Sequence, residues 1–517
     1  MRKKREGEKE LRGKLFNFRP LLFHSLFFAY GIFCAFLRIV KGWNFAVIFA
    51  PCLIALVLFF SKERKGALRK GTTLFLCFSL GVLSLSAQVK DHLSGNFYQG
   101  EYWVSAKVIE KEERQDYDFL YLESLNIGGI GEDGKMFLTV WDGSASGVKG
   151  GQEIYVRAKV TSKANRGRDG FFFGSIADDL RFHATATTKL TVTNEKSDLF
   201  SSVRERFKRT LYKGMDESAA DVSYALLTGS TYGIDAGLME NIRRGGIAHI
   251  FAVSGLHIGA LFGFCVLLCS KTRLSKLPDV GKFVLTASVV LFYGGVCGFT
   301  PSVVRATTVC LISYLCKTIG VKSDGLERTG GAMAIVLLLN PAELFTAGFL
   351  LSFSACYGIF TIGNSLQRGL KKVFDFTGEK GKAVFGFLGV SFGAQLFTAP
   401  ILLFFFGYLS VWGLFLNFLF VPLIGMVFAP LLAIVGACSI LPVGISSVVV
   451  RYVGDLVSAG LFVFEVLDFS FVIQSFQIGW IWTVVWFAVM ALLSGKVRLK
   501  KEKVNARFEI SKAEKSV

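Results

Sequence analysis

The sequence is poor in the residue patterns that mark secreted disulfide-bonded proteins or metal-binding ones. Its 10 cysteines fall almost wholly inside apolar runs, and none lies between Cys77 and Cys265. A disulfide framework is therefore not expected, and because no Cys-x-x-Cys pair occurs, neither is a cysteine-based metal site. We expect no metal and no other cofactor.

The chain also lacks a recognisable cleaved leader and a phosphate-binding loop. It begins with the basic run Arg2-Lys3-Lys4-Arg5, its first apolar run starts beyond Arg19, and no small-residue cleavage site follows that run. No Gly-x4-Gly-Lys-Ser/Thr loop occurs, because Gly131-Glu-Asp-Gly-Lys135 has the wrong spacing. ATP hydrolysis by that chemistry is not expected, so any transport would need a partner or the membrane potential.

The abundant residues are apolar. Hydrophobic residues make up 52% of the 517 residues, 52 of them are phenylalanine, and the mean hydropathy is +0.50. This composition is typical of a polytopic membrane protein. The net charge is +19, but residues 91–199 hold 13 Lys+Arg against 17 Asp+Glu, or −4, which leaves +23 for the remainder. Most of that positive charge lies beside apolar runs, as in cytoplasmic loops, and does not by itself indicate a nucleic-acid binder.

The order of apolar and polar runs predicts an α-helical membrane protein of about twelve spans with both termini cytoplasmic, several spans being broken. An extracytoplasmic small β-barrel, similar to the OB-fold, is expected between the spans. The predicted segments are a basic N-terminus (1–19), three transmembrane helices (20–89), the β-domain (90–197), an amphipathic helical segment at the membrane interface (198–245), a second transmembrane domain (246–495) and a basic tail (496–517).

The β-domain is predicted from short runs rich in β-branched and aromatic residues, several with period-two alternation, separated by glycine turns. Its acidic balance favours an inert domain. Its second half nevertheless places Lys163, Arg166 and Arg168 close to three aromatic side chains, Phe171, Phe172 and Phe173. Cations beside rings are what a platform for a single nucleic-acid strand needs, because phosphates pair with cations while bases stack on rings.

The most unusual stretch is His249-Ile-Phe-Ala-Val-Ser-Gly-Leu-His-Ile-Gly259, which opens a long apolar run. Ionisable and polar groups such as His249, Ser254 and His257 are costly at membrane depth, so they are candidates for function. Gly255 and Gly259 are four residues apart, a spacing that lets another helix approach closely. The alternative is that all of these residues only pack helices, with Ser254 bonding its own backbone.

Several later apolar runs are interrupted by polar residues or proline. The interruptions are Thr300-Pro-Ser-Val-Val-Arg305, a short run over 330–339 that ends in Asn340-Pro-Ala-Glu343, Gln395 with Pro400, and Asn417 with Pro422. Broken helices expose backbone groups that must line a cavity or pair internally. Four such breaks predict a polar pathway through the domain.

These pieces together resemble the ComEC-type competence proteins, the inner-membrane channels of bacterial DNA uptake. The resemblance covers residues from about 30 to 495. It lies in the 249–258 stretch and in segments in the family's order: Leu226-Leu-Thr-Gly229, Pro301-Ser-Val-Val-Arg-Ala306, Asn340-Pro341, Gly348-Phe-Leu-Leu-Ser-Phe353, Gln395 with Pro400 and Asn417 with Pro422.

The resemblance implies a channel for single-stranded DNA in the bacterial cytoplasmic membrane. His249, Ser254, Gly255, His257, Gly259, Arg305, Asn340, Gln395 and Asn417 are the residues expected to matter for it. Implied partners are a cytoplasmic helicase or other ATPase, external DNA-receptor or pilus proteins and a second copy of the chain. Many family members also carry a metallo-β-lactamase-like nuclease domain, which needs a His-x-His-x-Asp-His cluster. No two of the five histidines here are two apart. We therefore expect no nuclease or other catalytic activity in this chain and a separate nuclease partner.

Two other functions stay open on the residues alone. Ser254 and His257 are three residues apart and could form the nucleophile and base of an intramembrane hydrolase, although Ala252-Val-Ser-Gly255 lacks the first glycine of the usual Gly-x-Ser-Gly. A small-solute transporter could use the broken helices, although an external β-domain is unusual for one. A metal held by His249 and His257 is disfavoured, because no Cys, Asp or Glu lies nearby in the sequence. Loss of activity in Ser254→Ala that Ser254→Thr does not restore would favour the hydrolase.

Overall fold

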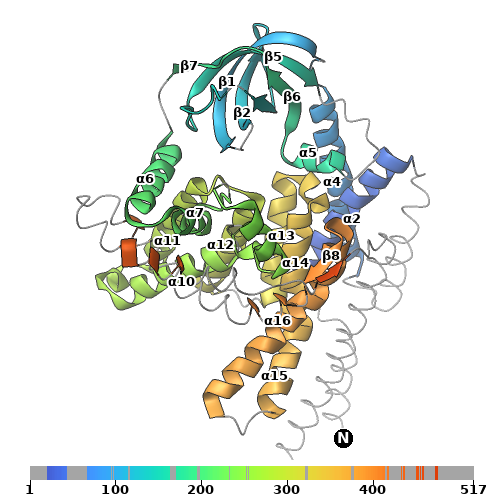
Figure 1. Cartoon of the computed structure of the whole chain (residues 1–517). Helices are drawn as coiled ribbons and strands as arrows, with labels where there is room; N and C mark the ends of the chain where they lie inside the picture. The colour runs from blue at the N-terminus through green and yellow to red at the C-terminus, as the bar shows by residue number, and fades with distance from the viewer. Residues whose placement is uncertain are drawn as a thin grey trace, which may run out of the picture.

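A computed structural model describes residues 20–42, 67–94, 96, 98–113, 117–141, 143–162, 171–194, 198–231, 233–251, 253, 255–320, 324–373 and 378–410, and short pieces between 412 and 474. Helices make up most of it, and a β-barrel lies at one end (Figure 1). The helix α15 lies at the end opposite the barrel. The described part therefore contains both the helical region and the β-domain that the sequence predicts.

The helical elements follow one another through most of the chain. They are α2 (Pro20–Lys41), α4 (Ala67–Leu93), α5 (Phe171–Ala177), α6 (Leu199–Gly214), α7 (Glu217–Thr228), α8 (Ala236–Arg244), α9 (Ala248–Phe251), α10 (Gly255–Lys271), η1 (Arg273–Lys276), α11 (Asp279–Val296), α12 (Pro301–Thr318), α13 (Gly325–Leu339), η2 (Pro341–Phe345), α14 (Ala347–Gly358), η3 (Ile359–Gly363), α15 (Asn364–Val373) and α16 (Gly378–Phe405).

The strands are concentrated between α4 and α6. They are β1 (Gln99–Glu113), β2 (Asp118–Ile127), β3 (Ile130–Glu132), β4 (Lys135–Val140), β5 (Glu153–Ser162), β6 (Leu180–Ala186) and β7 (Thr191–Asn194), with a separate small pair of β8 (Tyr408–Ser410) and β9 (Val472–Gln474).

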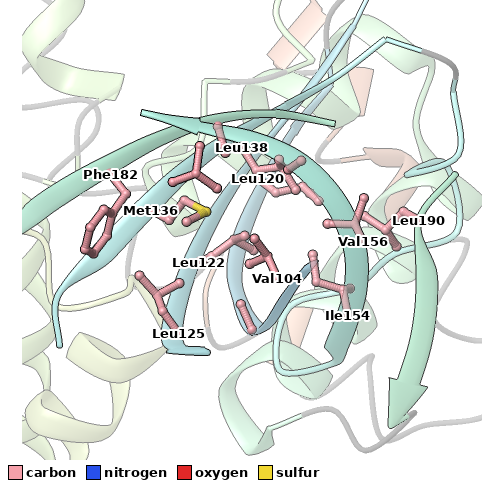
Figure 2. Close-up of a cluster of buried hydrophobic side chains, with 14 of the residues drawn as sticks. Val104, Leu120, Leu122, Leu125, Met136, Leu138, Ile154, Val156, Phe182 and Leu190 are labelled. Atoms are coloured by element: carbon pink, nitrogen blue, oxygen red, sulfur yellow. The ribbon is translucent and has the colours of Figure 1, made fainter. Parts of the chain in front are cut away.

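Five of these strands close into a barrel in the order β1-β2-β4-β6-β5, because β5 also pairs with β1. The β4–β6 pair is parallel and the other pairs of the ring are antiparallel. Every second side chain of a strand points into the barrel and fills its interior. Leu120, Leu122, Met136 and Leu138 come from neighbouring strands and pack there with Val156 (Figure 2). The predicted β-barrel is confirmed.

Five described helices are long and apolar enough to cross a membrane. Their apolar spans are Pro20–Val40, Gly71–Leu93, Asp279–Val296, Ala347–Lys371 and Gly386–Phe405. A sixth apolar helix, Gly255–Lys271, is shorter. These spans agree with a membrane protein. The second of the three transmembrane helices expected within 20–89 falls at 45–60, outside the described residues, and the total of about twelve stays a prediction.

One expected helix break is absent. Gln395 and Pro400 were predicted to interrupt a run, but α16 continues through Pro400 to Phe405. Proline lacks the backbone N–H of an interior helical bond, yet neighbouring helices let a membrane helix tolerate it. A distortion that the sequence did not reveal lies instead at η3, a π-helical turn between α14 and α15. The breaks before Pro301 and after Leu339 are confirmed as helix ends.

Candidate functional site

The stretch from His249 to Gly259, the central stretch from here on, is held between the end of α7 and the start of α12. The Ser302 hydroxyl donates a hydrogen bond of 2.7 Å to the carbonyl oxygen of Val253. On the other side, Gly229 ends α7 with a left-handed φ of 83°, and a Cβ there would lie 3.1 Å from Cγ2 of Val253. The glycine of the 226–229 segment therefore permits both the turn and the close contact.

The two histidines of the stretch differ in exposure. His249 on α9 is exposed, whereas His257 on α10 is buried, and the two rings are close enough to interact electrostatically. Ser254 lies outside the described residues, so the Ser254–His257 pair of the hydrolase hypothesis stays untested.

The close helix contact expected at Gly255 and Gly259 does not occur among the described residues. A Cβ at Gly255 would lie 3.9 Å from the Cβ of Ala306, an ordinary contact, and one at Gly259 would meet nothing within 4 Å. The tight glycine contacts lie elsewhere. A Cβ at Gly31 would overlap the carbonyl oxygen of Phe78 on α4, and one at Gly358 would overlap that of Gly393 on α16. Glycine spacing alone does not say which face of a helix meets a neighbour, so the described contacts do not support this expectation.

Arg305 lies one turn into α12 and forms an ion pair with Glu343 of η2. The Nη1 and Oε2 atoms are 3.8 Å apart, and the two side chains are only 4% and 6% exposed. A buried pair of this kind is costly to desolvate, so its presence needs a structural or functional reason. The sequence predicted Arg305 as a site residue but missed Glu343. The signal was an acidic residue in the otherwise apolar segment after Asn340-Pro341.

The Asn340 backbone lies next to the ion pair, because its carbonyl oxygen accepts a hydrogen bond from the Glu343 N–H. Its side chain connects α5, the helix between β5 and β6, to α4. Its Nδ2 donates 2.7 Å to the carbonyl oxygen of Ala177 in α5, and its Oδ1 accepts 2.8 Å from Nε2 of Gln88 in α4. Gln88 Oε1 in turn accepts from the backbone N–H of Ala342 at 3.0 Å. We call Gln88, Asn340, Ala342 and Ala177 the amide joint. It fixes η2, and with it Glu343.

A second polar cluster flanks the other side of the central stretch. Gln395 donates 3.3 Å to the carbonyl oxygen of Ser410, whose hydroxyl donates 2.6 Å to that of Arg244. Gly246, with φ of 74°, packs so closely that a Cβ there would lie 2.8 Å from Cβ of Ser410. Asn417 follows Ser410 closely in the sequence. Its Oδ1 is buried and accepts no hydrogen bond from the described residues. Gln395 thus supports the segment that leads into His249.

The amphipathic helix α6 uses its apolar face on the protein. Phe207 and Leu211 are buried in the core shared with α7, α10 and α11. The Phe200 ring lies against Gly295, and Arg204 Nη1 donates 3.1 Å to the carbonyl oxygen of Val296. The predicted amphipathic character is therefore present, while its place at the membrane surface stays a prediction.

The barrel's predicted basic patch cannot be described. Lys163, Arg166 and Arg168 lie outside the described residues, as do the side chains of Phe171, Phe172 and Phe173, whose backbone begins α5. A different aromatic pair is visible on β1 and β5: the rings of Trp103 and Tyr155 stack in parallel with centroids 4.8 Å apart. They are 47% and 39% exposed, and Arg157 lies opposite Trp103 in the strand register.

A charged clamp joins the end of α4 to the start of β6. Arg181 donates 2.8 Å to Asp91 and 3.0 Å to Asp179, and Nδ1 of buried His92 lies 3.4 Å from the same Asp179 oxygen. Burial alone would raise the pKa of Asp179, but the interactions with His92 and Arg181 outweigh it and hold this pKa below its ordinary value. The clamp and the amide joint both attach the barrel to α4.

The site as a whole is suited to holding an anion. Its only buried guanidinium among the described residues is that of Arg305, which lies between the central stretch and η2. Guanidinium groups bind carboxylates and phosphates through paired N–H donors. Gly255 lies near Ala306, the residue after Arg305, and the Glu343 N–H donates to the Asn340 carbonyl oxygen, while Gln395 lies in the second cluster.

Comparison with known proteins matches residues 226–501 to a family model described as competence protein. The ComE operon protein 3 of Bacillus subtilis (strain 168) is 29% identical over 202 residues, which cover 38% of this chain and 24% of that protein. Recombination protein 2 of Haemophilus influenzae (strain ATCC 51907 / DSM 11121 / KW20 / Rd) is 24% identical over 392 residues, 74% of this chain and 48% of that protein. The chain thus spans less than half the length of these curated relatives. No solved structure matches.

Proposed function

Because the chain belongs to the competence protein family, we propose that it carries single-stranded DNA inward across the bacterial cytoplasmic membrane. The observation that carries this proposal is the family match over 226–501, which includes the central stretch and both members of the Arg305–Glu343 pair. A polyanion that leaves water needs compensating charge along its path. Arg305, with the histidines at 249 and 257, supplies ionisable groups in that region.

The proposed architecture has about twelve spans, both termini in the cytoplasm and the barrel on the extracytoplasmic side of the membrane. We assign the barrel to the OB type, because its order β1-β2-β4-β6-β5 with one parallel pair is that of a five-stranded Greek-key barrel. OB barrels bind oligonucleotides or oligosaccharides. The Trp103–Tyr155 stack beside Arg157 is a described surface on which a base could stack.

Movement of the strand would depend on other proteins. The sequence has no phosphate-binding loop, so we assign the driving force to a cytoplasmic helicase or other ATPase. External receptor or pilus proteins would deliver the DNA, and a separate nuclease would remove the second strand. In this proposal the chain is a channel, not an enzyme.

Deletion of the gene in its native host tests the function. Import of fluorescent DNA into the cytoplasm and transformation should both be lost, and a plasmid-borne wild-type copy should restore them. Normal import in the deletion strain would refute a DNA channel. Lost import of a small solute with normal DNA import would favour the transporter alternative.

A further inference from the structure

Arg305 holds hydrogen-bonding capacity that the described residues do not use. The residue is 3% exposed, and its Nε and Nη1 atoms have no hydrogen-bond partner among the described residues. The Glu343 oxygen at 3.8 Å from Nη1 is beyond hydrogen-bond distance. A guanidinium offers five N–H donors, and leaving them unpaired in a buried place costs free energy. The resting pair therefore satisfies the charge of Arg305 but not its donors.

Arg305 meets the first turn of α14 at a residue that has no side chain. Gly348 is exposed, and a Cβ built there would lie 3.5 Å from Nη2 and 3.7 Å from Nη1 of Arg305. The absence of a side chain at this position removes one obstacle between the exposed surface of α14 and the two buried terminal nitrogens. Any larger residue would stand in that approach.

The other side of the pair carries an excess of negative charge. Glu343 Oε2 accepts 3.0 Å from the Thr346 hydroxyl, and Asp178 beside the barrel interacts electrostatically with the same carboxyl. Glu343 already compensates the single charge of Arg305, so Arg305 has no spare positive charge while Glu343 is in place. An anion can bind Arg305 strongly only if Glu343 gives way.

We propose that Arg305 is a seat for one phosphodiester group of the passing strand, reached past Gly348, and that Glu343 is the resident carboxylate that the phosphate displaces. Carboxylate and phosphate are the two anions that a guanidinium fork recognises with paired hydrogen bonds. The exchange keeps the buried cation compensated in both states, which avoids the cost of an unpaired charge. This inference rests on the proposed function and names a substrate contact within it.

Binding of a short fluorescent oligothymidylate to the purified full-length protein tests the exchange, because the variants should act in opposite directions. Glu343→Gln removes the competing carboxylate and should tighten binding by roughly threefold or more. Arg305→Gln should weaken it. Gly348→Val should also weaken it. Gly263→Val should leave it unchanged, because Gly263 is an exposed glycine of α10 at which a Cβ would meet no described atom within 4 Å.

A purely structural ion pair would give a different pattern. Unchanged or weaker binding by Glu343→Gln, or wild-type binding by Gly348→Val, would overturn the proposal. If Glu343→Gln does not fold, the Gly348→Val and Gly263→Val pair decides alone. Uptake in cells is scored separately: normal uptake without the gene would remove the proposed function, whereas gene-dependent uptake with the wrong binding pattern would remove only the phosphate seat.

Discussion

At the scale of single residues, the buried pair of Arg305 and Glu343 allows charge and stability to be separated. Arg305→Gln removes the guanidinium but leaves Glu343 buried without its counter-charge, which costs about 3–5 kcal/mol in comparable pairs. The double variant Arg305→Gln with Glu343→Gln removes both charges. We expect the double variant to regain membrane abundance relative to Arg305→Gln, while DNA uptake stays low in both. Immunoblots of membranes and transformation frequency measure the two effects, and normal uptake by the double variant would mean that the pair only packs.

A second prediction at this scale concerns pH. The lowered pKa of Asp179 means that the unfolded state binds more protons just below the ordinary aspartate pKa of about 3.9. The contribution of Asp179 to stability is therefore complete above that pH and is lost as pH falls through the lower folded value. Asp179→Asn, which tolerates the left-handed φ of 52°, should be less stable at neutral pH and lose less stability in acid. Tryptophan fluorescence during acid unfolding measures this, and identical acid profiles would contradict it.

The residues of the site were only partly predictable. Arg305 could be named from the sequence because an arginine in an apolar run is conspicuous. Its partner Glu343 lies 38 positions away (343 − 305), in a segment whose direction depends on the amide joint. The partners of Asn340 are 163 and 252 residues distant. Such pairings depend on how helices pack, which local spacing does not encode.

At the scale of elements, the amide joint connects α4, α5 and η2. Gln88→Leu removes the hydrogen bonds to Asn340 and to the Ala342 backbone, leaving part-buried polar groups unpaired at about 1–3 kcal/mol each. We expect a lower melting temperature and faster amide exchange in η2. Ser86→Ala is the control on the same helix, because among the described residues its hydroxyl donates only to the Val82 carbonyl oxygen of α4. Equal exchange in both variants would show that η2 is held by other contacts.

Glycine contacts between helices give another prediction at this scale. In α16, a Cβ at Gly393 would lie 2.6 Å from backbone atoms of Gly363, and no backbone can yield without moving a helix. Gly393→Ala should therefore destabilise the protein by about 1–3 kcal/mol, the usual cost of overpacking. Gly255→Ala should be tolerated, because its Cβ would make only an ordinary contact with Ala306. Melting temperatures in detergent compare the two, and a greater loss in Gly255→Ala would contradict the packing.

Elements differ in how well the sequence reveals them. The barrel was predictable because its strands alternate at period two, and this alternation alone places Leu120 and Leu122 inside. The continuity of α16 through Pro400 was not, because neighbouring helices can supply what proline removes. The π-turn η3 has no local sequence signal that the pattern of apolar residues could show.

At the scale of the whole molecule, the barrel is attached to the helical part at two described places on α4. The charged clamp lies at the end of α4 and the amide joint one turn earlier, where η2 also meets α5. Helix α2, which is the first of the five membrane-length helices, packs against α4 and α13. The hydrogen bonds of the amide joint therefore connect the barrel to η2, the element that carries Glu343.

The orientation of the whole molecule is the last prediction. The basic residues around η1 and α15 favour the cytoplasmic side of the membrane. The barrel then lies on the extracytoplasmic side. Ser146 is exposed on the barrel between β4 and β5, and Ser275 is exposed in η1, between α10 and the membrane-length helix α11. A cysteine at Ser146 should react with an impermeant thiol reagent in intact cells, whereas one at Ser275 should react only after the membrane is permeabilised. The parent protein with its own cysteines is the blank for both. The reverse pattern would place the barrel in the cytoplasm, where it could not meet DNA before the strand crosses the membrane.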